Sequence, residues 1–323
     1  MEDIKVSILC AAYNHEKYIR QTLDGFVKQK TNFKYEVIIH DDASTDKTAQ
    51  IIREYQAEYP DIIKPILQTE NQFSKKIPIL PAFMIPLLKG KYYAFCEGDD
   101  YWCDELKLQK QIDYLDRHTD YVACVHNTEY HYSDTDKRKV RYSTEDRDLS
   151  LADCIMRGGQ SYHTSSLIVR SGISHSKPQF TKMIAGVGDY PSAVYYALSG
   201  KIRYMGDVMS VYRLGTAGSW TAKIKKDRKK MLDTVQSTIE MLKEADAYSN
   251  NQYHELFEDA IEFHRYRIYI YHQEYKKAIQ CGKTFKKERF FTKVRYIVCT
   301  VFPFSVKLRN FIVNKYESDG KIL

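Results

Sequence analysis

The first 130 residues repeat one pattern, in which short apolar runs of strand length alternate with amphipathic segments. The apolar runs lie at residues 5–14, 35–42, 62–68, 91–100 and 121–130. Apolar residues at helical spacing fill the segments 16–29, 44–60, 81–90 and 104–118. Strands that are apolar throughout are typical of a parallel sheet covered on both faces. The pattern therefore predicts an α/β fold with a mixed, mainly parallel sheet flanked by helices.

Three of the expected strands end on polar side chains. Tyr13 follows the first strand, Asp41 and Asp42 end the second, and Asp99 and Asp100 end the fourth. Because the carboxyl ends of parallel strands meet at one edge of a sheet, we expect these side chains to share a rim. Open α/β sheets bind their ligands at that edge, so the rim is a candidate site.

The rest of the chain is less regular. Residues 131–160 are polar and charged, which predicts a loop-rich insertion. We expect further strands at 163–170 and 201–213, on either side of a helix at 188–200. From about residue 230 to 289, apolar residues recur at steps of three and four, which predicts a helical C-terminal region.

The charge of the chain is unevenly distributed and marks a domain boundary. The net charge is +7, and residues 1–222 hold 28 basic and 29 acidic residues, whereas residues 223–323 hold 21 and 13. The positive excess therefore lies in the last third. We expect an α/β domain over 1–222, with halves of about 1–130 and 131–222, and a basic helical region over 223–323.

The cysteines and the N-terminus indicate a cellular compartment. The seven cysteines are scattered, odd in number and without a CxxC pair, which argues against a disulfide framework and a Cys-rich zinc site. The opening "MEDIKVSILC" lacks the basic and long apolar regions of a signal peptide. No run reaches the roughly 20 apolar residues of a membrane span. We therefore expect a cytoplasmic protein.

The stretch "FCEGDDYW" (95–102) crowds three carboxylates, those of Glu97, Asp99 and Asp100, into four positions. One explanation is a cap for the helix that follows, but a cap needs a single carboxylate and Asp104 lies nearer to that helix. A divalent cation explains the crowding better, because hard cations such as Mg²⁺ take oxygen ligands and often hold substrate phosphates. The stretch predicts a metal site.

The stretch "IIHDDASTD" (38–46) carries the second pair of aspartates. A strand-to-helix turn with Ser44 or Thr45 as N-cap explains part of it but does not need both Asp41 and Asp42. A carboxylate at this position is suited to accept hydrogen bonds from a base N–H or a ribose hydroxyl.

Taken together, "VSILCAAYN", "IIHDDASTDKT" and "GKYYAFCEGDDYW" resemble the family 2 glycosyltransferases of the GT-A fold, over about residues 4–215. The stretch "EGDDYW…DELKLQKQIDYLDRH" is similar to the branch that builds bacterial capsule, lipopolysaccharide or other surface polysaccharides. The resemblance implies transfer of a hexosyl or N-acetylhexosaminyl group from a nucleotide-diphosphate donor, above all a UDP-sugar. It also implies a glycan or lipid-linked acceptor and a divalent cation, Mn²⁺ or Mg²⁺.

The resemblance implies roles for the residues at the predicted rim. Ala12 and Tyr13 would line the nucleotide base pocket, with Tyr13 packing on the base, and Asp42 would hydrogen-bond the base. Asp99 and Asp100 occupy the family's metal-binding DXD-type motif. Asp100 would ligate the metal, and Asp99 would contact the ribose or the metal's water shell.

The resemblance also implies a general base. Asp189 in "VGDYP" matches the family's base position, and one base opposite the leaving group implies inversion, so that an α-linked donor gives a β-linkage. The alternative for Asp189 is an N-cap, since a helix is expected directly after it. Lys75 and Lys76 lie where relatives carry basic contacts to the diphosphate.

The chain departs from the family pattern after residue 210. Relatives often place a metal- or diphosphate-binding His where Leu214 stands, so no His ligand is expected. Arg213 is a candidate phosphate contact, with a surface basic loop as the alternative. His163 faces the expected acceptor side or is a structural histidine, and Trp102 either lies beside the sugar or closes the core. The Gln-x-x-Arg-Trp motif of processive synthases is absent, which favours transfer of single sugars.

The basic tail mixes aromatic, aliphatic and lysine side chains over residues 286–315. Such a segment is suited to lie on anionic lipids at the inner membrane face. The alternative is an amphipathic helix packed on the catalytic domain. No recognition motif supports nucleic-acid binding.

Other functions remain alternatives. A sugar nucleotidyltransferase would also use paired aspartates, but its Gly-rich phosphate loop is missing from "CAAYNHEKY". A dinucleotide oxidoreductase would need GxGxxG after a strand. A non-catalytic nucleotide-sugar or membrane-binding protein would keep the fold and need neither Asp100 nor Asp189.

Overall fold

The structure is a computed structural model that describes residues 3–132, 135–140, 142–174, 177–184, 187–216 and 227–282. The chain separates into two compact units. The first comprises Met1–Leu151, Ser161–Lys177 and Tyr195–Ala222, and the second comprises Ala152–Gln160, Pro178–Val194 and Lys223–Leu323.

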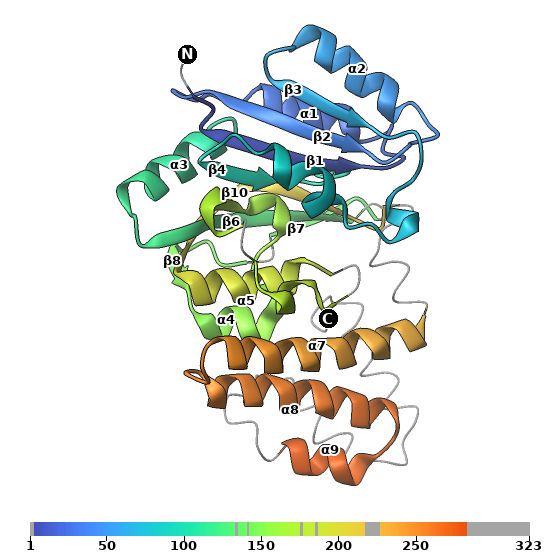
Figure 1. The fold of residues 1–323 in the computed structure, drawn as a ribbon, viewed down its shortest axis with the longest axis vertical. Coiled ribbons are helices and arrows are strands. Elements are labelled where there is room, and N and C mark those ends of the chain that lie inside the picture. The colour runs from blue at the N-terminus through green and yellow to red at the C-terminus, as the bar shows by residue number, and fades with distance from the viewer. Residues whose placement is uncertain are drawn as a thin grey trace. The chain divides into compact units, whose positions relative to one another are not determined.

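The first unit is built on one sheet (Figure 1). Its strands are β1 (Val6–Ala12), β2 (Tyr35–Asp41), β3 (Ile63–Leu67), β4 (Tyr92–Phe95), β5 (Tyr101–Trp102), β6 (Tyr121–Tyr132), β7 (Lys137–Val140), β8 (Arg147–Leu149), β9 (Ile168–Arg170) and β10 (Lys201–Leu214). Their order is β3-β2-β1-β4-β9-β6-β10-β5, with β7 paired to β6 and β8 to β10. β1 is parallel to β2 and β4, β2 to β3, and β6 to β10, whereas β9 is antiparallel to β4 and β6. The predicted mixed, mainly parallel sheet is confirmed.

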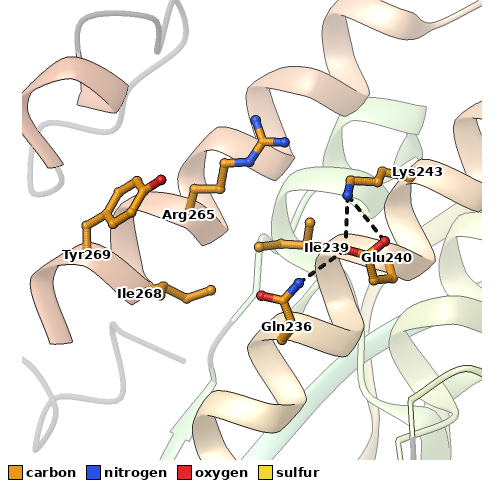
Figure 2. A pocket seen from close by; sticks show the side chains of 7 residues that line it. All are labelled: Gln236, Ile239, Glu240, Lys243, Arg265, Ile268 and Tyr269. Carbon is orange, nitrogen blue, oxygen red and sulfur yellow. Dashed lines mark hydrogen bonds and ion pairs between the residues drawn. The ribbon is translucent and has the colours of Figure 1, made fainter. Parts of the chain in front are cut away.

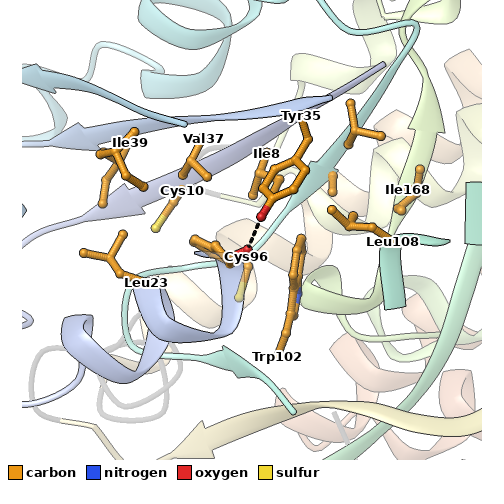
Figure 3. Close-up of a cluster of buried hydrophobic side chains, with 14 of the residues drawn as sticks. Ile8, Cys10, Leu23, Tyr35, Val37, Ile39, Cys96, Trp102, Leu108 and Ile168 are labelled. Carbon is orange, nitrogen blue, oxygen red and sulfur yellow. Dashed lines mark hydrogen bonds between the residues drawn. The ribbon is translucent and has the colours of Figure 1, made fainter. Parts of the chain in front are cut away.

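Helices α1 (Ile19–Val27), α2 (Thr48–Glu58) and α3 (Lys107–Arg117) share one core with the sheet. Figure 3 shows Ile8 and Cys10 of β1 packed with Leu23 of α1 and Leu108 of α3. Alternate residues of a strand point to one face, so one face of β1 meets these helices. The other face is buried too, and there the hydroxyls of Tyr93 and Tyr196 lie 2.7 Å apart.

Two segments of the first 160 residues differ from the sequence prediction. The helix expected at 81–90 is a π-turn, Leu80–Met84, followed by a 3₁₀ turn, Ile85–Leu87, because prolines 81 and 86 lack the N–H of a regular helix. The prediction of a loop-rich insertion at 131–160 is wrong. This segment supplies β7, β8 and helix α4 (Leu151–Arg157), and Leu149 is buried.

Helices dominate the second unit, with α7 (Arg228–Tyr248), α8 (His254–Tyr271) and α9 (Tyr275–Gly282) packed in sequence order. Asp227 caps α7 by accepting a hydrogen bond from the Lys230 N–H at 3.1 Å. The predicted helices are confirmed as far as residue 282, whereas the basic segment 286–315 lies outside the described residues. Within the described part of the chain, no helix is long and apolar enough to span a bilayer.

A groove of about 260 Å³ lies between α7 and α8 (Figure 2). It is lined by Gln236, Ile239, Glu240, Lys243, Arg265, Ile268 and Tyr269. Lys243 and Gln236 both donate to Glu240, at 2.9 and 3.1 Å. The groove contains none of the residues that the sequence marks as functional.

Candidate active site

The polar ends of β1, β2 and β4 lie at one edge of the sheet. Ala12 pairs with Asp41 across the parallel β1–β2 ladder, and Leu9 pairs with Phe95 across β1–β4. Beyond the strands, the Gly98 N–H donates to the Ala11 carbonyl at 2.9 Å. The predicted rim is therefore confirmed, and it brings the end of β1, the Asp41–Asp42 pair and the Glu97–Asp100 turn together.

Both aspartates of the β2 end are buried and bind the backbone of neighbouring loops. Asp41 accepts hydrogen bonds from the N–H and the hydroxyl of Ser44, at 3.1 and 2.5 Å. Asp42, only 4% exposed, accepts one from the Gln72 N–H at 2.8 Å and one from the Phe73 N–H at 3.0 Å. These bonds within the strand-to-helix turn therefore explain why an aspartate is present at position 41. Asp42 ties the β2 end to the loop after β3, and its carboxylate keeps lone pairs for a ligand.

The Glu97–Asp100 turn is held by the end of β10. Asp100 is 1% exposed, and its Oδ1 accepts a hydrogen bond from the Arg213 N–H at 3.0 Å. Asp99 Oδ2 accepts one from the Thr216 hydroxyl at 2.9 Å, and the Arg213 guanidinium donates to the Asp99 carbonyl. These contacts fix both carboxylates before any ligand arrives.

The Glu97–Asp100 turn carries three carboxylates, and Arg213 does not fully offset their negative charge. Burial raises the pKa of Asp100 well above its ordinary value, and the nearby Asp99 and Glu97 raise it further, whereas Arg213 acts in the opposite direction. A divalent cation would favour the ionised form, so this carboxylate set fits one. The described residues contain no cluster of three or more His, Cys, Asp or Glu side chains able to hold a metal. A cation bound here would resemble Mg²⁺ held by one or two carboxylates together with substrate phosphates and water.

Arg213 is buried, with 6% of its surface exposed, so the surface-loop alternative is wrong for this residue. Its guanidinium lies 4.5 Å from the Tyr101 ring and 5.1 Å from the Tyr18 ring and also donates to the Gln21 side chain. Burial lowers the pKa of Arg213 from its ordinary value. The residue connects α1, the carboxylate turn and β10.

Trp102 closes the core behind the turn. It is 3% exposed, its Nε1–H donates to the Ser165 carbonyl at 2.8 Å, and its ring packs edge-on against Phe26 at 4.8 Å. Of the two interpretations offered by the sequence, the structure therefore favours the core residue over a sugar contact.

His163 and Thr164 approach the same turn from another direction. His163 Nε2 lies 3.8 Å from Asp100 Oδ2, and its ring stacks on Tyr212 at 4.1 Å. Its Nδ1 lies 2.7 Å from the Ser165 hydroxyl and 3.2 Å from the Ser165 N–H, so the neighbouring turn holds the ring in place. The Thr164 hydroxyl donates to Glu97 at 3.1 Å. Sequence reasoning missed Thr164, although it directly follows the candidate His163 in the chain.

Asp189 lies in the second unit, as the first residue of α5 (Asp189–Ser199). Its Oδ1 accepts a hydrogen bond from the Tyr190 N–H at 2.8 Å, which is compatible with a capping role. Although the residue reaches the surface, the partial loss of hydration raises the pKa of its carboxyl above the ordinary value. The Tyr190 hydroxyl donates to the Ile155 carbonyl at 2.5 Å and anchors this end of the helix.

The remaining predicted residues lie on exposed loops. Tyr13 is 45% exposed. Lys75 forms an ion pair with Glu70, and Lys76 is an exposed residue with a positive φ of 61° at the end of a 3₁₀ turn. Both lysines follow the loop that Asp42 holds.

Gly98 leaves no room for a side chain inside the turn. A Cβ at this position would lie 2.8 Å from His15 Nδ1, 3.0 Å from Ala12 Cβ and 3.0 Å from Ile19 Cδ1. We expect Gly98→Ala to destabilise the fold by about 1–3 kcal/mol through overpacking. Chemical denaturation measures this, with Gly172→Ala as control because a Cβ there meets nothing within 4 Å. Equal stability of the two variants would show that the turn yields easily.

Comparison with known proteins identifies the family. The family model described as Glycosyl transferase family 2 matches residues 7–170, about half of the chain. The chain belongs to this family. An uncharacterized Mycobacterium tuberculosis protein, Rv1520, is 39% identical over 71% of the chain, which spans 64% of that relative's length. The Escherichia coli UDP-Glc:alpha-D-GlcNAc-diphosphoundecaprenol beta-1,3-glucosyltransferase WfaP is 33% identical over 34% of the chain and 41% of its own length.

Solved structures show the same fold. The Staphylococcus aureus protein TarS, residues 1–349 with UDP-GlcNAc, has a TM-score of 0.61 at 17% identity, covering 99% of this chain and 88% of that one. The mannosyltransferase PcManGT of Pyrobaculum calidifontis, solved with GDP-Man and Mn²⁺, has a TM-score of 0.50 at 14% identity, covering 97% and 87%. At these identities the likeness supports the GT-A-like fold.

Proposed function

We propose that the chain is a metal-dependent inverting glycosyltransferase that acts in the synthesis of bacterial surface polysaccharide. The observation that carries the proposal is the crowded Asp99–Asp100 turn, in which Asp100 is buried, at the rim of a family 2 sheet. Similar proteins support a UDP-sugar donor and a glycan or lipid-linked acceptor. TarS was solved with UDP-GlcNAc, and WfaP is named for UDP-Glc and a diphosphoundecaprenol acceptor.

In this proposal the first unit binds the donor. Tyr13 packs on the base, and Asp42 accepts a hydrogen bond from it, using a lone pair that the Gln72 and Phe73 amides leave free. Asp100, with Asp99 beside it, would hold a Mn²⁺ or Mg²⁺ ion, which would neutralise the charge that grows on the departing diphosphate. Lys75 and Lys76 remain candidates for contacts with that diphosphate.

The proposed general base is the carboxylate of Asp189. Asp189 takes the proton from the acceptor hydroxyl, whose oxygen bonds to the anomeric carbon as the bond to the diphosphate breaks. Attack on the face opposite the leaving group inverts the anomeric centre, so an α-linked donor yields a β-linked product. The basic segment 286–315 is proposed to hold the enzyme at the cytoplasmic face of the membrane, close to a lipid-linked acceptor.

A panel of sugar nucleotides tests the function. The full chain is incubated with UDP-glucose, UDP-GlcNAc, UDP-galactose and GDP-mannose, with Mn²⁺ or with a chelator, and release of nucleoside diphosphate is measured. We expect release from a UDP-sugar that depends on the cation. Release that is the same in chelator would contradict the metal role, and the absence of release and of binding for every donor would contradict the function.

A further inference from the structure

Two exposed aromatic side chains lie on loops at the carboxyl ends of β1 and β3, the two strands that flank β2. Tyr13 follows β1 and is 45% exposed, and Phe73, which sequence reasoning did not mark, follows β3 and is 61% exposed. In the described part of the chain, neither ring stacks on another aromatic ring. The exposed ring of Phe73 leaves apolar surface in water, and covering that surface with a ligand would be favourable.

Asp42 joins the two loops. Its N–H donates to the Ala12 carbonyl at 3.0 Å, directly before Tyr13, and its carboxylate accepts the Phe73 N–H at 3.0 Å. The Asn71 side chain donates to the Asp42 carbonyl, also at 3.0 Å. Asp42 therefore ties both the backbone directly before Tyr13 and the backbone of Phe73 to one buried residue.

The strands that lead into the two loops lie two positions apart in the sheet. Ala12, Asp41 and Leu67 are in register across β1, β2 and β3. Neighbouring strands lie about 4.8 Å apart, so β1 and β3 are separated by roughly 10 Å. A flat ring stacked between two others needs about 7 Å, at roughly 3.5 Å for each contact, so this separation leaves room for a base between side chains that follow β1 and β3.

We infer that Phe73 forms the second wall of a nucleobase pocket, opposite Tyr13, with Asp42 as its floor. The ligand class is a nucleoside diphosphate whose planar base lies between the two rings. This inference rests on the proposed function, and it adds a specificity-determining residue on the loop after β3. Phe73 acts through its ring, whereas Lys75 and Lys76 remain candidates for contacts with the diphosphate.

Calorimetric titration of uridine and of UDP tests the pocket, with the wild type, Phe73→Ala and Phe73→Trp. Loss of one base–aromatic contact lowers affinity by roughly tenfold. We therefore expect Phe73→Ala to bind uridine and UDP more weakly by the same factor, and Phe73→Trp to keep the wild-type affinity for both. Leu106→Ala is the matched control, because Leu106 is 45% exposed in the same unit. Since the Phe73 ring is mostly exposed, the melting temperature should stay near that of the wild type.

The outcomes separate the pocket from the function. The pocket would be overturned if Phe73→Ala bound both ligands as tightly as the wild type, or if it lost affinity for UDP but not for uridine. In either case, UDP binding by the wild type would still support the proposed donor class. Failure of the wild type to bind UDP would overturn the proposed function and the pocket with it.

Discussion

Asp189→Asn is expected to lower kcat by about 10²–10⁴-fold while the affinity for UDP stays unchanged, because asparagine cannot take the proton of the acceptor hydroxyl. The amide oxygen can still accept the Tyr190 N–H, now at 2.8 Å, so the start of α5 should keep its shape. Steady-state kinetics and calorimetry separate the two effects. Transfer at the wild-type rate would place the base elsewhere and leave Asp189 as a helix cap.

The pH profile gives an independent check on the same residue. The partial loss of hydration raises the pKa of Asp189 above its ordinary value, and a general base acts only when it is ionised. The wild-type kcat should therefore be maximal above that raised pKa and should fall as the pH drops through it. The midpoint of this fall should lie above the usual Asp pKa of about 4. The residual activity of Asp189→Asn should lack this acidic limb.

Arg213→Met is expected to cost about 3 kcal/mol of folding free energy, since it removes a buried cation from a carboxylate turn. The Asp99 carbonyl and the Gln21 side chain both lose a donor, and Asp100 loses the positive charge that favours its ionised form. Arg213→Lys keeps the positive charge but cannot donate to the Asp99 carbonyl and the Gln21 side chain with a planar guanidinium. We therefore expect a smaller loss of folding free energy. Urea denaturation measures both variants.

The exposed Arg53 supplies a control for Arg213. Arg53→Met should change the stability by less than about 0.5 kcal/mol. If Arg213→Met is as stable as this control, Arg213 does not brace the turn, and its direct use by the donor phosphates becomes the better explanation of its position.

The sequence predicts the fold most accurately where a strand is apolar on both faces. The runs that form β1, β2 and β4 are mostly apolar, which marks each of them as a buried strand. Their parallel pairing then places Asp41 and Asp99 at one edge of the sheet. The segment 131–160 gave no such signal. β7 and β8 are short and mostly polar, and they pair only because β6 and β10 offer long edges.

The supports of the candidate site were hidden by their distance along the chain. Thr164 and Thr216 contact Glu97 and Asp99 from 67 and 117 positions away, so no local spacing reveals them. The sequence allowed Arg213 to be a phosphate contact or a residue of a surface loop, because the glycine-containing stretch "VYRLGTAGSW" resembles a loop. Only the fold shows that Arg213 is buried. Local patterns predicted the carboxylates themselves but not what holds them.

Asp100→Asn should leave the fold intact. The neutral amide can still accept the Arg213 N–H, and it relieves the repulsion that Asp99 and Glu97 exert on the ionised carboxylate. A loss of function in this variant is therefore informative about ligand binding rather than folding.

The affinity for UDP, measured by calorimetry with and without Mn²⁺ in the wild type and in Asp100→Asn, tests the central claim most directly. We predict that Mn²⁺ strengthens UDP binding by the wild type by roughly tenfold or more, which is about 1.4 kcal/mol, and that Asp100→Asn binds UDP equally weakly in both conditions. The same Mn²⁺ effect in both proteins, or none in the wild type, would contradict a metal site at the Asp99–Asp100 turn.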